Sequence, residues 1–289
     1  TTVLRVLKSV ESQLPQQLKP RSFPEVLMVD EFRSHASYED KMSFICADGE
    51  TGELVDILPS RKLDKIIPYF NRSPLEEREK VKFLVTDMNA AYFQLTKNVF
   101  PTAKLIIDRF HIVKHLNTAF NDFRVREMKR LITNKKKSKA NKLKSNWKLL
   151  LKNQTNISIS EFKTWRSFPS PKYHLLTESM VIDRLLSFSS ELKEAYDIFH
   201  LLMYHFRNKD DRSFFELLKN LPDSLDTQFR DKIENLISYE EGIRNALKYN
   251  FSNGKLEVKY THIKTLKRVS YGFNSFTNMR IRIFLINGL

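Results

Sequence analysis

Three aspartates stand at the ends of apolar stretches of the chain. Asp30 closes VLMVD, Asp87 closes FLVTD and Asp108 closes KLIID. Such runs are typical of buried strands, and α/β sheets bind ligands beyond the carboxyl ends of their parallel strands. A carboxylate there is costly to bury unless a cation pairs with it. An Arg or Lys side chain would serve as well as a metal ion, so each single aspartate leaves both possibilities open.

Two carboxylates on neighbouring strands repel each other when both are ionised. A pair of Mg²⁺ ions would remove this repulsion, because Mg²⁺ prefers carboxylate, water and phosphate oxygens. Two ions roughly 3.5–4 Å apart can activate a nucleophile and stabilise the leaving oxygen in phosphoryl transfer. A third carboxylate from a helix would complete the site, and spacing does not choose among Glu240, Glu241 and Glu257. Glu257 stands among many basic residues, which fits a metal ligand flanked by phosphate contacts or an ordinary surface salt bridge.

The elements that would position these acids alternate in type. Strands are expected at 26–32, 41–49, 53–60, 81–88 and 103–110, with a tight turn between the second and the third. Helices are expected at 63–81, in two pieces, and at 89–100. From His111 to about Tyr249 the apolar residues recur at helical spacing, and a last helix should begin at about Lys255. This order predicts an α/β fold, in which helices cover a mixed sheet and an all-helical block follows.

The composition points to an anionic partner. The 289 residues include 49 basic and 34 acidic ones, a formal net charge of +15, and nucleic acid is the first candidate for such a chain. The single cysteine, Cys46, excludes an internal disulfide and a cysteine-rich zinc site, and it fits a reducing cytoplasm. No apolar run approaches the length of a membrane span. The first residue is Thr rather than Met, as expected of a fragment of a longer chain.

Basic residues gather in two stretches that could contact DNA. The first belongs to the helical block and includes Lys135, Lys136, Lys137, Lys139 and Lys142, with Trp147 close behind. Lysines there would contact phosphates without reading the sequence, and Trp147 could stack on an unpaired base. A solvated helix face with the tryptophan in the core would give the same pattern. The second stretch, Lys264, Lys267 and Arg268, shares its helix with Glu257 and is the stronger candidate.

Four segments together resemble one known family. They are VDEF around Asp30, LVTDMNAAY around Asp87, FPTAKLIIDRFHIVKH at 100–115, and SNGKLE with IKTLKRVSYGF at 252–273. The pattern is similar to that of the ISL3 family of DDE transposases from bacterial insertion sequences. The resemblance implies an RNase H-like mixed sheet with a large all-helical insertion before the last catalytic helix. It divides the chain into a linker (1–25) after a missing DNA-binding region, a first core part (26–120), the helical insertion (121–240) and C-terminal core helices (241–289).

The resemblance also implies an activity. Asp30, Asp87 and Glu257 would be the catalytic triad and would hold two Mg²⁺ ions, for which Mn²⁺ can substitute. The protein would cleave double-stranded DNA at transposon ends and transfer the strand into target DNA. It would act as a homo-oligomer on the nucleoid in the bacterial cytoplasm, with no role for a membrane.

Two further features accompany the resemblance. Asp108 and His111 form a D-x-x-H pair, in which the acid would lie behind the metal ligands and the histidine would order the site or contact flanking DNA. Asp108 could instead cap the helix that follows. Val258 and Tyr260 stand where the family usually has Gly and Asn. Because of this departure, two alternatives stay open: a catalytically inert DNA-binding remnant of a transposase, and a nuclease on the same RNase H-like fold.

Overall fold

The computed structural model describes residues 9, 22–34, 40–169, 172–270, 273 and 275–287. Most of the expected N-terminal linker lies outside these residues. The contacts divide the chain into two units, one formed by residues 1–111 and 241–289 and the other by residues 112–240. We call them the sheet unit and the helical unit and describe each by itself.

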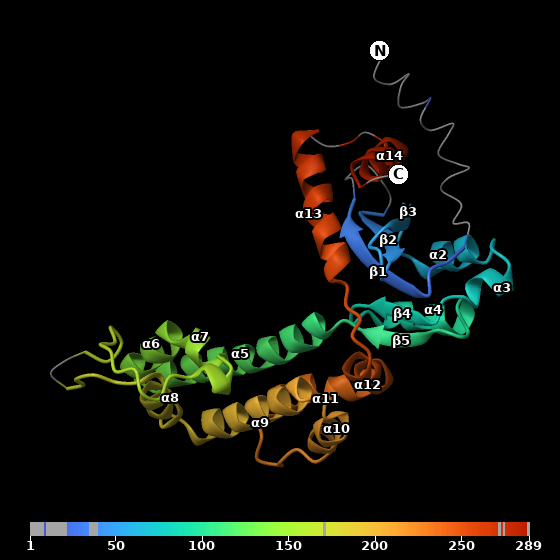
Figure 1. The fold of residues 1–289 in the computed structure, drawn as a ribbon. Helices are drawn as coiled ribbons and strands as arrows, with labels where there is room; N and C mark the ends of the chain where they lie inside the picture. The colour runs from blue at the N-terminus through green and yellow to red at the C-terminus, as the bar shows by residue number, and fades with distance from the viewer. Residues whose placement is uncertain are drawn as a thin grey trace. The chain divides into compact units, whose positions relative to one another are not determined.

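The sheet unit is built on five strands (Figure 1). They are β1 (Val26–Arg33), β2 (Met42–Asp48), β3 (Leu54–Leu58), β4 (Phe83–Thr86) and β5 (Lys104–Ile107). The order across the sheet is β3-β2-β1-β4-β5. The pairs β1–β2 and β2–β3 are antiparallel, whereas β1–β4 and β4–β5 are parallel. The predicted α/β fold with a mixed sheet is confirmed.

The turn between β2 and β3 shows why the hairpin forms where the sequence places it. The Asp48 carboxylate accepts hydrogen bonds from the backbone N–H groups of Glu50 (2.7 Å) and Thr51 (3.2 Å). Gly52 adopts φ +79°, a conformation that side chains with a Cβ disfavour. These two devices reverse the chain and bring β3 back beside β2.

Helices cover both faces of the sheet. Leu27 and Val29 of β1 belong to a core with residues of α2 (Leu63–Phe70) and α4 (Phe93–Asn98). In this core Phe70 and Phe100 have ring centroids 5.1 Å apart. Along the chain, α3 (Leu75–Arg78) and a 3-10 turn, η1 (Ala90–Tyr92), come between α2 and α4. Side chains alternate along a strand, so Asp30 and Phe32 face the other side. There Phe32 contacts Tyr260 of α13 (Gly254–Val269), with ring centroids 6.4 Å apart.

The last helix, α14 (Phe276–Ile286), is anchored to the sheet by an ion pair. Its Arg280 donates from Nε to the buried Asp56 carboxylate of β3 (2.9 Å), and the Tyr69 hydroxyl of α2 also contacts Asp56. The edge strand β5 is covered by α12 (Glu240–Lys248), because Asn245 donates its amide N–H to the Leu105 carbonyl at 2.8 Å. A covered edge cannot pair with another chain.

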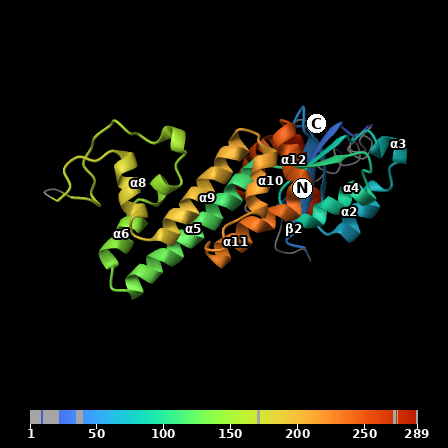
Figure 2. The same cartoon turned by 90° about the horizontal axis from the view of Figure 1, so that it is seen from below.

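The helical unit packs around two long helices, α5 (Arg109–Thr133) and α9 (Ser190–Arg207), which lie side by side (Figure 2). Phe120 of α5 stacks on Phe199 of α9, with ring centroids 4.8 Å apart. The remaining elements are α6 (Lys137–Ser145), α7 (Trp147–Leu150), η2 (Gln154–Asn156), α8 (Glu178–Leu186), α10 (Asp211–Lys219), α11 (Thr227–Glu234) and η3 (Asn235–Tyr239). None of the helices in the described part of the chain is long and apolar enough to cross a membrane.

Candidate active site

The carboxyl ends of the parallel strands bring Asp30 and Asp87 close together. Met28 of β1 pairs with Val85 of β4, so continuing this register by two residues places Asp30 level with Asp87. Thr86 of β4 pairs with Ile107 of β5, and Asp108 follows at the same level. All three aspartates therefore lie at the carboxyl ends of neighbouring parallel strands, where ligands of α/β folds bind.

The surroundings of Asp30 disfavour the charged form of its carboxyl group. Burial raises its pKa from 3.8 to about 6, and the neighbouring Asp87 carboxylate raises it as well. The Glu31 backbone N–H (2.7 Å), the Tyr260 hydroxyl and His111 lower the pKa without offsetting burial. A positive ion beside Asp30 and Asp87 would favour their charged forms, so this pair fits a hard divalent cation.

The turn after β4 orients the Asp87 side chain. Its Oδ1 accepts a hydrogen bond from the Asn89 backbone N–H at 3.0 Å, and Asn89 in turn caps the short helix η1 through Ala91 N–H at 3.1 Å. Asp87 is half-buried. A carboxylate that is fixed at one oxygen can present the other to a ligand without a large loss of side-chain entropy.

Glu31, the neighbour of Asp30, is paired on the opposite face of the sheet. It accepts hydrogen bonds from Arg61 (2.6 Å) and from the Tyr92 hydroxyl (3.1 Å). This pairing supplies the cation that a buried carboxylate needs, so Glu31 serves the packing of that face. Of the two adjacent acids, Asp30 is the one whose side chain lies on the same face of the sheet as α13, level with Asp87.

Asp108 and His111 have different roles in the structure. Asp108 is buried and accepts the Phe110 backbone N–H at 3.3 Å, so it caps α5, which begins at Arg109 rather than at His111. His111 lies near enough to Asp30 to lower its pKa, and its ring meets Phe110 edge-to-face at 5.5 Å. The capping interpretation thus describes Asp108, whereas ordering of the site by Asp108 and His111 stays a prediction.

The helix that carries Glu257 lies against β1. Asn253, just before α13, donates its amide to the Val29 carbonyl at 3.3 Å, and Tyr260 faces Asp30. Glu257 lies between these two on the same helix, with its side chain exposed. Within the described residues, no three His, Cys, Asp or Glu side chains gather closely enough to hold a metal ion together. Asp30 and Asp87 are neighbours, and the part of Glu257 in the triad stays a prediction.

Two residues at this site were not predicted as functional. The Tyr260 hydroxyl and the Asn253 Oδ1 are buried and make no hydrogen bond of normal geometry with the described residues, although Tyr260 influences the pKa of Asp30. Buried polar atoms of this kind usually await water, an ion or a ligand. Tyr260 was visible in the sequence only as a departure from a family pattern, and Asn253 only as part of a turn. Val258 is 57% exposed, so most of its side chain faces away from the packed interior.

The three basic residues of α13 that were predicted to contact DNA divide into two groups. Lys264 and Arg268 are exposed and can reach a phosphate. Lys267 is half-buried and donates to the carbonyls of Arg33 (2.6 Å) and Ser34 (3.2 Å), and burial lowers its pKa. Lys267 therefore ties α13 to the end of β1.

The lysines of the helical unit also differ in their surroundings. Lys139 and Lys142 lie over aromatic rings, at 5.2 Å from Phe188 and 4.5 Å from Phe168 respectively. Trp147 is 39% exposed. Lys135, Lys136 and Lys137, at the junction of α5 and α6, are exposed.

Comparison with known proteins identifies the family of the chain. The family model of ISL3-type DDE transposases, described as Transposase, matches residues 27–283. The chain belongs to this family, and its mixed five-stranded sheet with abundant helices is consistent with the RNase H-like fold expected for it. A curated protein from Lactococcus lactis subsp. lactis, named ATP-dependent protease, is 40% identical over 116 residues, which is 39% of this chain and 36% of that protein. The chain thus matches about a third of the length of that relative.

Proposed function

We propose that this chain is the catalytic part of a transposase that cuts DNA at transposon ends and joins the freed 3′ hydroxyl to target DNA, with Mg²⁺ as its cofactor. One observation supports the proposal above others: Asp30 and Asp87 are neighbours at the carboxyl ends of parallel strands in a chain of this family. Transfer to a second DNA would require both DNA partners in one complex, which a homo-oligomer on the nucleoid would supply.

The residues at the carboxyl ends of the parallel strands fit Mg²⁺. Asp30 and Asp87 would hold Mg²⁺, with Glu257 as the third ligand from α13. Bound Mg²⁺ would polarise the scissile phosphodiester and favour the deprotonated nucleophile. The backbone N–H of Asn89 would orient the Asp87 carboxylate, and the backbone N–H of Glu31 would orient the Asp30 carboxylate. Lys264 and Arg268 would neutralise phosphates on either side of the cut.

Glu257 is preferred over the two other acids in that part of the chain. The Glu240 carboxylate pairs with Lys219 at 2.8 Å, which gives it a structural partner. Glu241 belongs to α12, which covers the edge of β5. Only Glu257 lies on the helix whose Tyr260 faces Asp30.

Cleavage and strand transfer of a plasmid that carries the element's own ends test the proposal. The Asp30→Asn, Asp87→Asn and Glu257→Gln variants should each abolish the Mg²⁺-dependent cut, and Glu241→Gln is the matched control that should keep it. A Glu257→Gln protein that cuts normally would remove Glu257 from the triad. If Asp30→Asn and Asp87→Asn also cut normally, the proposed chemistry is wrong.

Tyr260 favours a second candidate function, an inert DNA-binding protein. Its hydroxyl faces Asp30 at a position where the family usually has Asn, and a tyrosine there takes room that a metal ion could use. Wild-type protein that binds DNA but neither binds Mn²⁺ nor cuts would establish this function. Hydrolysis without strand transfer would indicate the nuclease instead.

A further inference from the structure

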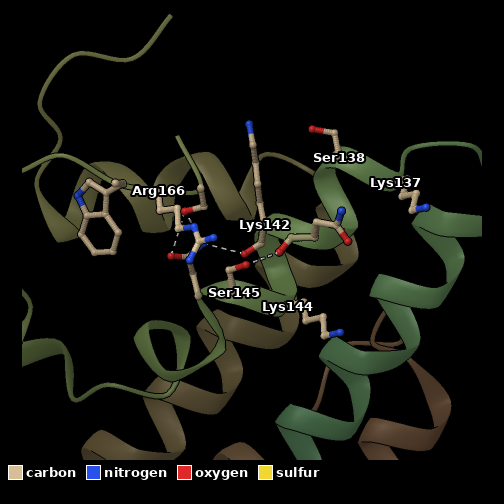
Figure 3. Close-up of a pocket in the computed structure, with 10 residues that line it drawn as sticks. Lys137, Ser138, Lys142, Lys144, Ser145 and Arg166 are labelled. Carbon is tan, nitrogen blue, oxygen red and sulfur yellow. Dashed lines mark hydrogen bonds between the residues drawn. The ribbon is translucent and has the colours of Figure 1, made fainter. Parts of the chain in front are cut away.

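A groove on the helical unit is lined by cations and hydroxyl groups. It has a volume of about 1060 Å³ and runs along α6 to the loop that holds Arg166 (Figure 3). Its charged residues are Lys137, Lys142, Lys144 and Arg166, and none of its described lining residues is acidic. Four like charges around an open groove without a counter-charge attract an anion.

The groove has walls that are already fixed. Asn146 is buried, and its amide donates to the Lys142 carbonyl (2.7 Å) and to the Ser167 hydroxyl (3.0 Å), so it ties the end of α6 to the opposite wall. Trp165 on that wall donates its indole N–H to the Leu176 carbonyl at 2.9 Å. A ligand therefore meets a site that needs little ordering on binding.

The shape of the groove favours a polymer over a single anion. Residues 137, 141 and 145 line it at intervals of four, and they form one stripe along α6. The nine residues of α6 span about 13 Å, at 1.5 Å per residue. One strand of B-DNA advances about 3.4 Å per nucleotide, so the stripe matches roughly four nucleotides. An isolated phosphate would use only a fraction of it.

We propose that this groove binds the phosphodiester backbone of double-stranded DNA through Lys144 and Arg166, with the Ser138 hydroxyl as a further donor. The indole of Trp165 forms an apolar wall for the sugar. The proposal rests on the proposed function for its ligand and adds a DNA site on the helical unit. Arg166 was not singled out from the sequence, because it lies 22 residues beyond Lys144 and only the fold brings the two to one groove.

The first test measures affinity for a random-sequence 20-bp duplex by fluorescence anisotropy at several salt concentrations, in the presence of EDTA. Each phosphate contact contributes about 0.9 to the slope of log K against log salt. The variant Lys144→Gln/Arg166→Gln should therefore lose about two units of slope and bind roughly 10- to 60-fold more weakly at 0.1 M salt. The control Lys193→Gln/Arg212→Gln removes the same charge from exposed positions of the helical unit outside the groove, and it should change affinity less than about 3-fold.

Equal losses in both variants would show that net charge alone matters, and would overturn the proposal. So would a groove variant that binds like the wild type, or one that loses affinity for RNA but not for DNA. An unchanged circular dichroism melt checks that the exposed substitutions leave the fold intact.

A crosslinking test locates the DNA without relying on loss of binding. The native Cys46 is fully buried, so a cysteine introduced at Ser138 can be labelled selectively with a photo-crosslinker. Ser138→Cys should crosslink to the duplex, whereas Ser190→Cys on α9 should not; equal yields would contradict DNA binding in the groove.

Both tests are also run in Asp30→Asn protein. Groove binding without cleavage by the wild type would refute only the transposase chemistry, and cleavage by a wild type that shows no groove binding would refute only this inference.

Discussion

Replacing Asp30 with asparagine should stabilise the metal-free protein at neutral pH. Moving the pKa of the Asp30 carboxyl from 3.8 in the unfolded chain to about 6 in the folded one corresponds to about 3 kcal/mol, at 1.36 kcal/mol per pH unit. The folded state binds the proton more tightly, so stability falls as pH rises from about 4 to 6, and the full cost remains above that window. The asparagine side chain would carry no charge, and its Oδ1 can still accept the Glu31 N–H.

Urea unfolding in EDTA measures the effect. The free energy of unfolding of Asp30→Asn should exceed that of the wild type by about 3 kcal/mol at pH 8, and the two should converge near pH 4. Comparing the two proteins at each pH cancels the titration of distant groups. Glu31→Gln is the contrasting variant, because it breaks the pair with Arg61 and should lose stability. An Asp30→Asn protein that is less stable than the wild type at pH 8 would refute the reasoning.

Three other substitutions probe the scaffold, each followed by urea unfolding. Burial lowers the pKa of His200 from 6.5 to about 4, so the folded state binds the proton more weakly and stability falls as pH drops through that window; His200→Gln should remove up to about 3 kcal/mol of this acid sensitivity. Gly49→Ala should cost about 1–3 kcal/mol, since the new Cβ would overlap the Val26 side chain; no loss would mean that the turn shifts freely. Arg280→Met should cost about 3–5 kcal/mol because it leaves Asp56 buried and charged, and a smaller loss would mean that water reaches Asp56.

The strands could be predicted because their signals are local. Four of the five expected runs contain their strands, and β1 extends one residue beyond its run, to Arg33; the Asp48-Gly49 and Thr51-Gly52 pairs mark the hairpin turn. The family and the fold class were also within reach, because motifs such as DRFH and IKTLKRVSYGF carry the resemblance to the family that matches residues 27–283. The start of α5 was placed two residues late, since Asp108 caps it directly through Phe110 N–H.

The surroundings of the acids could not be predicted from local patterns. Whether Asp30 meets a lysine, a metal or another carboxylate depends on strand register, which brings together residues 57 positions apart. Tyr260 approaches Asp30 from a helix more than 200 residues away, and no local pattern marked its hydroxyl as buried. Lys267 looked like a DNA contact, yet its ammonium binds two backbone carbonyls.

The number of Mn²⁺ ions that the protein holds on DNA tests the central claim most directly. Electron paramagnetic resonance would count ions bound to the complex with a duplex carrying the transposon end, in wild-type and Asp30→Asn protein. The wild type should hold two ions per catalytic site, Asp30→Asn should hold fewer, and the count should be unchanged in the Glu241→Gln control. Two ions retained by Asp30→Asn, or none bound by the wild type, would contradict the claim.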